Sequence, residues 1–163
     1  MSLLSIVEYP AKVLSQVGEP VEDFDAGLEH LVQDMFETMY EAEGVGLAAP
    51  QVGLSLRLFV MDCDGIKLVA ANPLILSEEG EQTGDEGCLS IGKVHAPVKR
   101  ASRIVLRAQD LNGQAFEKEA TGLAARCFRH ETDHCDGILF INHLTPLRRE
   151  MVKKRFLKLK KMR

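Results

Sequence analysis

The residues best suited to chemistry lie between His130 and His134, where the sequence reads HETDH. Two histidines four residues apart lie on one face of an α-helix, because about 3.6 residues make a turn. They can therefore bind one metal ion together, with Glu131 beside them as a general base. The flanking residues 123–128 and 138–141 are largely apolar. Because ligand-type side chains are costly to bury unless they are paired or metal-bound, the run predicts metal-assisted hydrolysis rather than a solvated surface helix.

A hydrolytic metal site usually needs a third protein ligand, with a fourth position left for water. In the best-known extension of the motif, a third histidine follows downstream, but Phe140 stands at that position and cannot bind a metal. Cys88 is the better candidate, within the sequence EGCLS at 86–90. Gly84 and Gly87 beside it indicate a thiol on a tight turn or a bulge. A lone cysteine is also a common core residue, so the spacing leaves both interpretations open.

A third segment, Gly44–Gly53, is rich in glycine and alanine, which allow another backbone to approach closely. Gln51 in this segment carries an amide N–H that can donate to a developing oxyanion. Taken alone, the segment is equally typical of a glycine-rich turn after a helix. It lacks the Lys-Ser/Thr pair of a phosphate-binding P-loop, so it does not predict a nucleotide site.

In this order, the three segments resemble the motifs of the peptide deformylase family, whose enzymes remove the N-formyl group from nascent bacterial and organellar proteins. The family motifs read G-φ-G-L-A-A-x-Q, where φ is apolar, then E-G-C-L-S and H-E-x-D-H. The chain matches them at 44–51, 86–90 and 130–134, and the resemblance extends over nearly its whole length. Three ordered motifs are far more specific than any one of them.

The resemblance implies a metal site and a base. Cys88, His130 and His134 would bind one catalytic metal ion per chain, and Glu131 would take a proton from water and deliver it to the leaving amine. Members of the family commonly use Fe(II), with Zn(II), Ni(II) or Co(II) as substitutes. Thiolate and imidazole suit several of these metals, so Fe(II) is an expectation that comes from the resemblance alone.

The resemblance also assigns residues around the metal. Gln51 and the backbone N–H of Leu89 would stabilise the oxyanion of the tetrahedral intermediate. Gly46 and its neighbours would pair with the backbone of an N-formyl-methionyl nascent peptide as an added strand. Glu86 and Arg100 resemble an ion pair that steadies the cysteine loop in the family.

The expected pocket for the first side chain is lined by Val45, Leu123 and Cys127, which suit an unbranched thioether. The aliphatic part of Arg126 is either buried in this pocket or directed away from it. Asp133 either supports the motif helix or is exposed. The strictness for methionine stays open, because the chain departs from the family's usual residues near the site. These departures are Gly92, His95, Arg129 and Cys135.

Two other functions fit parts of the pattern. A zinc endopeptidase is disfavoured by the missing downstream ligand and by Cys88 in its place. A noncatalytic binding module is disfavoured because the ligands, the base and the oxyanion donor are all present. Hydrolysis of an N-formyl group is the remaining hypothesis.

The composition places limits on the class of protein. A chain of 163 residues with 45% hydrophobic content predicts one domain, residues 1–163, with a substantial core. The first eight residues do not read as a signal peptide, and no apolar run approaches the roughly 18 residues of a membrane span. The four cysteines form no C-x-x-C pair. A cytoplasmic protein with reduced thiols and no membrane contact is expected.

The predicted elements place the motifs in an α+β fold, with antiparallel β-sheets around a central motif-bearing helix and with N-terminal and C-terminal helices. A first helix should span residues 26–42, capped by Asp25 and ended by Gly44. Asn112-Gly113 predicts a β-hairpin, and Thr121 is a candidate cap for the motif helix. The expected strands are 56–62, 67–71, 104–110 and 115–120.

The C-terminal residues predict a basic helix at about 146–162, begun by Thr145-Pro146. Residues 148–163 hold nine Lys or Arg and one acidic residue, giving +8, whereas the rest of the chain carries −12 of the total charge of −4. Such a helix is often only a solvated face. The family resemblance instead implies contact with ribosomal RNA near the peptide exit.

Overall fold

The computed structural model describes residues 3–162. The HETDH motif lies on the middle one of three α-helices, as predicted. These helices are α1 (Ala26–Glu41), α2 (Gly122–Cys135) and α3 (Pro146–Lys161). Short 3-10 helices are η1 (Lys12–Ser15), η2 (Ala49–Val52), η3 (Leu89–Ile91) and η4 (Phe140–His143). Of the helices in this part of the chain, none combines the length and the apolar character needed to cross a membrane.

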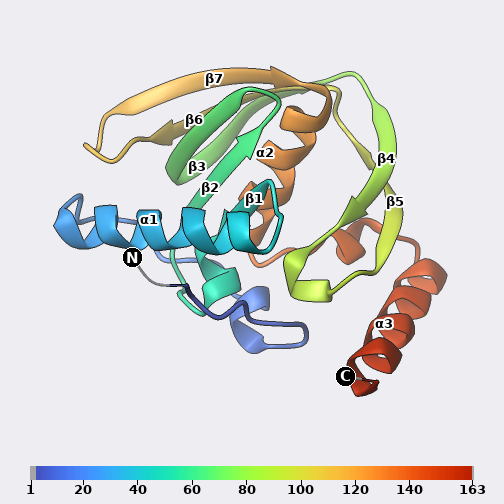
Figure 1. Cartoon of the computed structure of the whole chain (residues 1–163). Helices are drawn as coiled ribbons and strands as arrows, with labels where there is room; N and C mark the ends of the chain where they lie inside the picture. The colour runs from blue at the N-terminus through green and yellow to red at the C-terminus, as the bar shows by residue number, and fades with distance from the viewer. Residues whose placement is uncertain (1–2, 163) are drawn as a thin grey trace.

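The strands form two separate sheets, and every pair of these strands is antiparallel. The larger sheet has the order β1-β2-β3-β6-β7, and the smaller sheet pairs β4 with β5. Helix α2 lies between the two sheets (Figure 1). The predicted α+β fold is therefore confirmed. The strands are β1 (Gly46–Ala48), β2 (Leu58–Cys63), β3 (Ile66–Glu79), β4 (Gln82–Gly87), β5 (His95–Arg100), β6 (Arg103–Gln109) and β7 (Ala115–Thr121).

Helix α1 begins as predicted, because Asp25 Oδ1 accepts a hydrogen bond from the backbone N–H of Leu28 at 3.0 Å. The prediction that Gly44 ends the helix is wrong. The last helical residue is Glu41, and Glu43 rather than a glycine takes the left-handed conformation, with φ of 59°. Gly44 instead leaves room for a neighbour, since a Cβ there would lie 2.8 Å from Leu89 Cδ1.

Strand β3 is much longer than the predicted 67–71, because it continues through Asn72-Pro73. Asn72 has a φ of 53°, and the pairing with β6 shifts register between Ala71 and Leu74. The Asn-Pro sequence, which is typical of a turn, therefore forms an irregular part of the strand and does not end it. The hairpin at Asn112-Gly113 is confirmed: Gln109 pairs with Ala115 across it.

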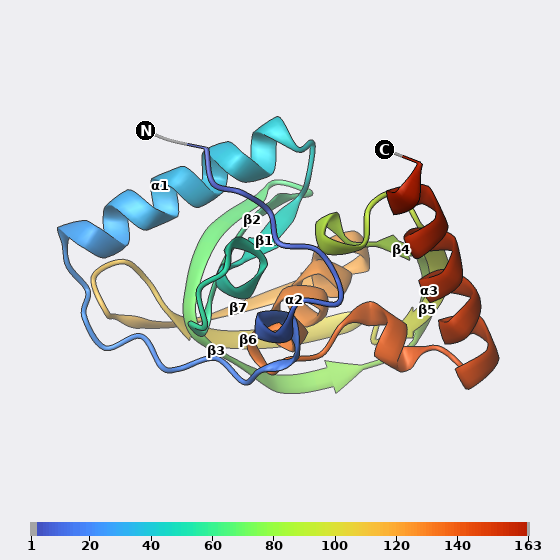
Figure 2. The ribbon, with the colours of Figure 1, turned by 90° about the horizontal axis from the view of Figure 1, so that it is seen from below.

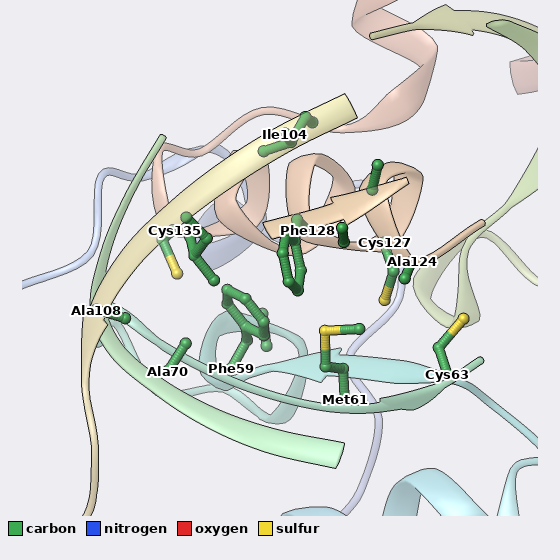
Figure 3. Close-up of a cluster of buried hydrophobic side chains, with 14 residues drawn as sticks. Phe59, Met61, Cys63, Ala70, Ile104, Ala108, Ala124, Cys127, Phe128 and Cys135 are labelled. Carbon is green, nitrogen blue, oxygen red and sulfur yellow. The ribbon is translucent and has the colours of Figure 1, made fainter. Parts of the chain in front are cut away.

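The main core lies between α2 and the concave face of the larger sheet. Phe128 of α2 and Phe59 of β2 are both fully buried and point toward each other, with Met61 and Ile104 around them (Figure 3). Thr121 precedes α2 but its side chain makes no capping hydrogen bond, contrary to expectation. Because α2 is buried on nearly all sides, packing rather than a cap sets its position.

Helix α3 begins as predicted, with Thr145 Oγ1 accepting from the Arg148 N–H at 3.3 Å. It lies beside β4 and β5 in both views (Figures 1 and 2). Val152 and Phe156 are its buried residues, and they pack in the second hydrophobic cluster of the molecule. The other side chains of α3 are exposed or half-buried, and most of them are basic.

Candidate metal centre

The three predicted metal ligands meet at one place. His130 and His134 lie on α2, and Cys88 is the residue that follows β4. One donor atom from each side chain lies within 4.8 Å of the others, and Cys88 Sγ is 3.4 Å from His134 Nε2. All three residues are buried. A thiolate and two imidazoles are a donor set typical of zinc or ferrous iron.

The local conformation of Cys88 differs from the prediction of a tight turn or a bulge. Cys88 is extended, with φ of −145°, and Gly84 and Gly87 both lie in strand β4 with no positive φ. The two glycines instead leave room for side chains of neighbouring elements. A Cβ on Gly84 would lie 2.9 Å from Arg126 Nη2, and one on Gly87 would lie 2.7 Å from the ring of His95.

The hydrogen bond between His130 and Glu86 is of the kind that orients a metal-binding histidine. His130 Nδ1 lies 2.7 Å from Glu86 Oε1. Burial would raise the pKa of Glu86, but hydrogen bonds from His130 and Arg100 hold this pKa well below its usual range. Glu86 is therefore an acceptor, so Nδ1 of His130 carries a proton and donates it to Glu86. Burial would lower the pKa of His130, but the hydrogen bond with Cys88 and the charge of Glu131 raise it well above its usual value, so an ion bound at Nε2 would replace a proton there. Burial also lowers the pKa of His134, which favours its neutral, ligating form.

Glu131 stands next to the ligands with its charge poorly compensated. It is 4% exposed, and its Oε2 lies 4.0 Å from His130 Nε2. Among residues 3–162, no hydrogen-bond partner reaches its Oε1. Burial raises the pKa of Glu131 to about 7, while the charge of His130 acts in the opposite direction. A carboxylate with a pKa near neutrality can both accept and return a proton.

Glu86 is the centre of a buried ionic network. Arg100 donates to both of its oxygens, from Nε at 3.1 Å and from Nη2 at 2.5 Å. Arg126 Nη1 donates to Oε2 at 2.7 Å. Arg100 also reaches Asp133 at 3.1 Å, and Asp133 is 2.8 Å from His143 Nε2. The sequence did not decide whether Arg126 and Asp133 are buried. In the structure both are buried, and each has an ionic partner.

Gln51 and Leu89 approach the cluster from two different 3-10 helices. Gln51 is buried, and its Oε1 accepts from the Ala48 N–H at 3.0 Å. Its Nε2 therefore points at Cys88 Sγ, 3.5 Å away, and at Ser90 Oγ, 3.3 Å away. Leu89 is the first residue of η3, so the helix itself cannot satisfy its backbone N–H. Ser90, which steadies Gln51, had no signal in the sequence beyond its place in the EGCLS motif.

A pocket of about 340 Å³ opens beside the cluster. The four predicted substrate-binding residues all line it, together with the ligands Cys88 and His130. Val45 and Leu123 are 45% and 49% exposed, so they lie at its rim, whereas Cys127 is buried. Burial raises the pKa of Cys127 well above its usual value, so this thiol stays protonated.

Strand β1 presents an open edge to this pocket, because β1 is the terminal strand of the larger sheet. Val45 O accepts from the Asp62 N–H at 2.9 Å, which directs the backbone of Val45 toward β2. Since neighbouring residues of a strand face opposite sides, Gly46 directs its N–H and C=O to the open edge. A Cβ on Gly46 would lie 2.6 Å from Glu131 Oε2, so glycine allows this edge to lie against the base.

The departures from the family pattern lie around the ligands but do not replace any of them. His95 is at the pocket wall, its side chain 54% exposed. Gly92 has a left-handed φ of 64° next to Phe156. Arg129 Nε lies 3.1 Å from Asp133 Oδ1, and Cys135 is a core residue.

Comparison with known proteins agrees with this geometry. The family model described as polypeptide deformylase matches residues 3–150. A peptide deformylase of Acidobacterium capsulatum is 46% identical, and the alignment covers 99% of this chain and 98% of that protein. The crystal structure of a peptide deformylase from Legionella pneumophila has a TM-score of 0.94 and 43% identity, covering 99% and 97% of the two chains. That of the peptide deformylase from Thermus thermophilus has a TM-score of 0.90 and 43% identity, covering 98% and 99%.

The match covers nearly the full length of both chains and includes the elements that carry the Cys-His-His cluster. The prediction drawn from the three motifs is confirmed at the level of family and reaction. The chain belongs to the polypeptide deformylase family, the metal-dependent hydrolases that remove the N-formyl group from peptides.

Proposed function

We propose that Cys88, His130 and His134 hold one divalent metal ion and that Glu131 is the general base of deformylation. The observation that carries this proposal is the buried Cys-His-His cluster beside a carboxylate whose Oε1 has no partner within residues 3–162. A divalent ion bound there would polarise the formyl carbonyl and lower the pKa of bound water from ~15.7 toward neutrality.

The chain's own residues supply the other steps. The peptide lies along β1 as an added strand, hydrogen-bonded to Gly46, with its first side chain in the pocket between Val45, Leu123 and Cys127. Glu131 accepts a proton from the attacking water and returns it to the leaving amine. Gln51 Nε2 and the Leu89 N–H donate to the oxyanion of the tetrahedral intermediate. The products are formate and a free α-amine.

The metal proposed for the protein in the cell is Fe(II). A thiolate with two imidazoles binds Fe(II), Zn(II), Ni(II) and Co(II), so the donor set supports a transition metal and the family resemblance supports iron. The proposed location is the cytoplasm. All four cysteines are free thiols, as is usual in a reducing compartment.

A comparison of three peptides tests the proposed reaction against endopeptidase activity. The metal-loaded protein is incubated with formyl-Met, acetyl-Met and unblocked Met versions of one tripeptide. We expect formate from the formyl-Met peptide and no cleavage of internal peptide bonds in any of the three. The reason is that the oxyanion donors and the metal ligands lie where the blocked end of a peptide paired with β1 would be. Cleavage of an internal peptide bond would contradict the proposal.

A second proposal concerns a partner of α3, the exit region of the ribosome. Helix α3 is basic along the whole of its length, and the basic side chains that face outward include Lys154, Arg155, Lys158 and Lys161. Arg163 lies outside the described residues. A face of this kind binds RNA phosphates through an ionic attraction that weakens steeply with salt.

Replacing these four residues of α3 with glutamine is expected to lower ribosome affinity by at least tenfold at low salt and to flatten its salt dependence. Full deletion of 152–163 is a poorer test, because Val152 and Phe156 pack in a core cluster. Co-sedimentation with ribosomes measures the effect, with Lys67→Gln and Lys118→Gln together as the control on another surface. Unchanged binding of the quadruple variant would refute the proposal.

A further inference from the structure

The proposed metal ligands lie on two separately built parts of the molecule. His130 and His134 are on α2, which packs against the five-stranded sheet, whereas Cys88 follows β4 of the two-stranded sheet. Figure 1 shows that β4 and β5 lie on the side of α2 opposite the larger sheet, and we call this pair of strands the β4–β5 arm. Across residues 3–162, no backbone hydrogen bond joins α2 to β4 or β5. Side-chain contacts therefore join α2, which carries the two imidazoles, to the strand that leads to the sulfur.

The side-chain connections between α2 and these two strands are few and can be followed one by one. Gln82 Nε2 donates to the Gly122 carbonyl at 2.8 Å, but this contact is exposed and lies at the first turn of α2. Among the described residues, every other hydrogen bond or ion pair between α2 and the two strands is buried and passes through one of two arginines or through His130 itself. Arg100 lies on β5 and reaches Asp133 of α2. Arg126 extends in the opposite direction, from α2 to both strands.

Of these groups, Arg126 is the residue of α2 that forms hydrogen bonds to both β4 and β5. Its Nη1 donates to Glu86 Oε2 of β4 at 2.7 Å and to the Val98 carbonyl of β5 at 3.1 Å. Its side chain is 6% exposed, and its Nη2 lies against Gly84, whose missing side chain makes the space for it. A guanidinium donates in several fixed directions at once, which a lysine ammonium cannot imitate.

Arg126 also lies one helical turn before His130, and both donate to Glu86. Glu86 in turn is two residues before Cys88. A movement of Glu86 would therefore shift both the strand that leads to the sulfur and the carboxylate that orients the imidazole. Outer groups of this kind commonly change metal affinity by 10–100-fold when they are removed.

We propose that Arg126 is a positioning residue that holds the β4–β5 arm to α2 and thereby sets the geometry of Cys88 relative to His130 and His134. The inference rests on the proposed metal ligands. It goes beyond them because Arg126 is neither one of the three ligands nor the proposed base or an oxyanion donor. Its expected effect is on how firmly the protein keeps its metal, and only secondarily on turnover.

The test is the rate at which Co(II)-loaded protein gives up its metal to an excess of chelator, followed by loss of the visible Co(II) absorption. Arg126→Met keeps the aliphatic stem and removes the guanidinium, and it is expected to lose Co(II) ~10–100-fold faster than the wild type. A changed Co(II) absorption before the chelator is added is also expected. Arg126→Lys should fall between the two.

Gly84→Ala provides a second perturbation that leaves Arg126 in place. The new Cβ would lie 2.9 Å from Nη2, so the guanidinium must shift, and we expect metal loss several-fold faster than in the wild type. Gln82→Leu is the matched control: it removes the exposed bond between the same two parts and should release Co(II) within twofold of the wild-type rate.

The outcomes separate this inference from the proposed function. Equal release rates for the wild type, Arg126→Met and Gly84→Ala would overturn the role of Arg126 while leaving the metal site intact. Equally fast release from Gln82→Leu would also overturn it, because general loosening of the arm would then explain the effect. Failure of the wild type to bind Co(II) would instead refute the metal site itself.

Discussion

Glu131→Gln is expected to lower kcat by a factor of ~10²–10⁴ while the protein still binds one metal ion per chain. Glutamine has nearly the same shape but cannot accept a proton. Glu131 is buried at the pocket wall with a pKa raised to about 7, so its carboxylate is suited to exchange a proton with water and with the leaving amine. Formate release gives the rate, and elemental analysis of the same sample gives the metal content.

The control for this variant is Glu41→Gln, which removes an exposed carboxylate at the end of α1 and should leave kcat within twofold. Two results would count against Glu131 as the base. One is a kcat close to that of the wild type. The other is loss of the metal together with the activity, which would assign Glu131 to the integrity of the site rather than to proton transfer.

Gln51→Leu is expected to lower kcat by ~10²–10³, with a much smaller change in KM. The amide is held in a fixed direction: its Oε1 accepts from the Ala48 N–H, and its Nε2 faces Cys88 and Ser90. A donor fixed in advance and aimed at developing charge stabilises the transition state more than the bound substrate. Steady-state kinetics with a formyl-Met tripeptide separates the two parameters.

A companion substitution, Gln51→Glu, keeps the oxygen that accepts from Ala48 but removes the N–H donor. It should therefore be as inactive as the leucine variant, while Gln33→Leu on the exposed face of α1 should be unaffected. If the glutamate variant retained wild-type kcat, Gln51 would be supporting the backbone at Ala48 and not the oxyanion.

The sequence predicted the ligands because their chemistry resides in side-chain type and short spacing. His130 and His134 face the same direction on any α-helix, so their pairing needs no knowledge of the fold. Cys88 is different, since it lies 42 positions before His130 in the chain. Its role came from the resemblance to a family, and its location beside the histidines depends on how β4 packs against α2.

The elements that sequence reasoning missed are those in which local preference and tertiary structure disagree. Strand β4 contains two glycines and two acids, residues that are depleted in strands, yet it pairs along its whole length with β5. Asn72-Pro73 is typical of a turn but lies inside β3. In both cases pairing with a neighbouring strand outweighs the local preference.

The positions of Arg126 and Asp133 could not be predicted for a related reason. A charged side chain on a helix is usually solvated, and burial becomes favourable only when partners from other elements surround it. Here Glu86 from β4 and Arg100 from β5 supply these partners. The network is a property of the assembled fold, and no short segment of the chain contains it.

Formate release from a formyl-Met tripeptide, by protein purified without oxygen and loaded with Fe(II), tests the proposed metal site and its reaction together. We expect rapid release by a protein holding one ion per chain, and loss of this activity after exposure to air, since a ferrous thiolate site is open to oxidation. Absence of formate from a protein that holds one ion through Cys88, His130 and His134 would refute the proposed reaction.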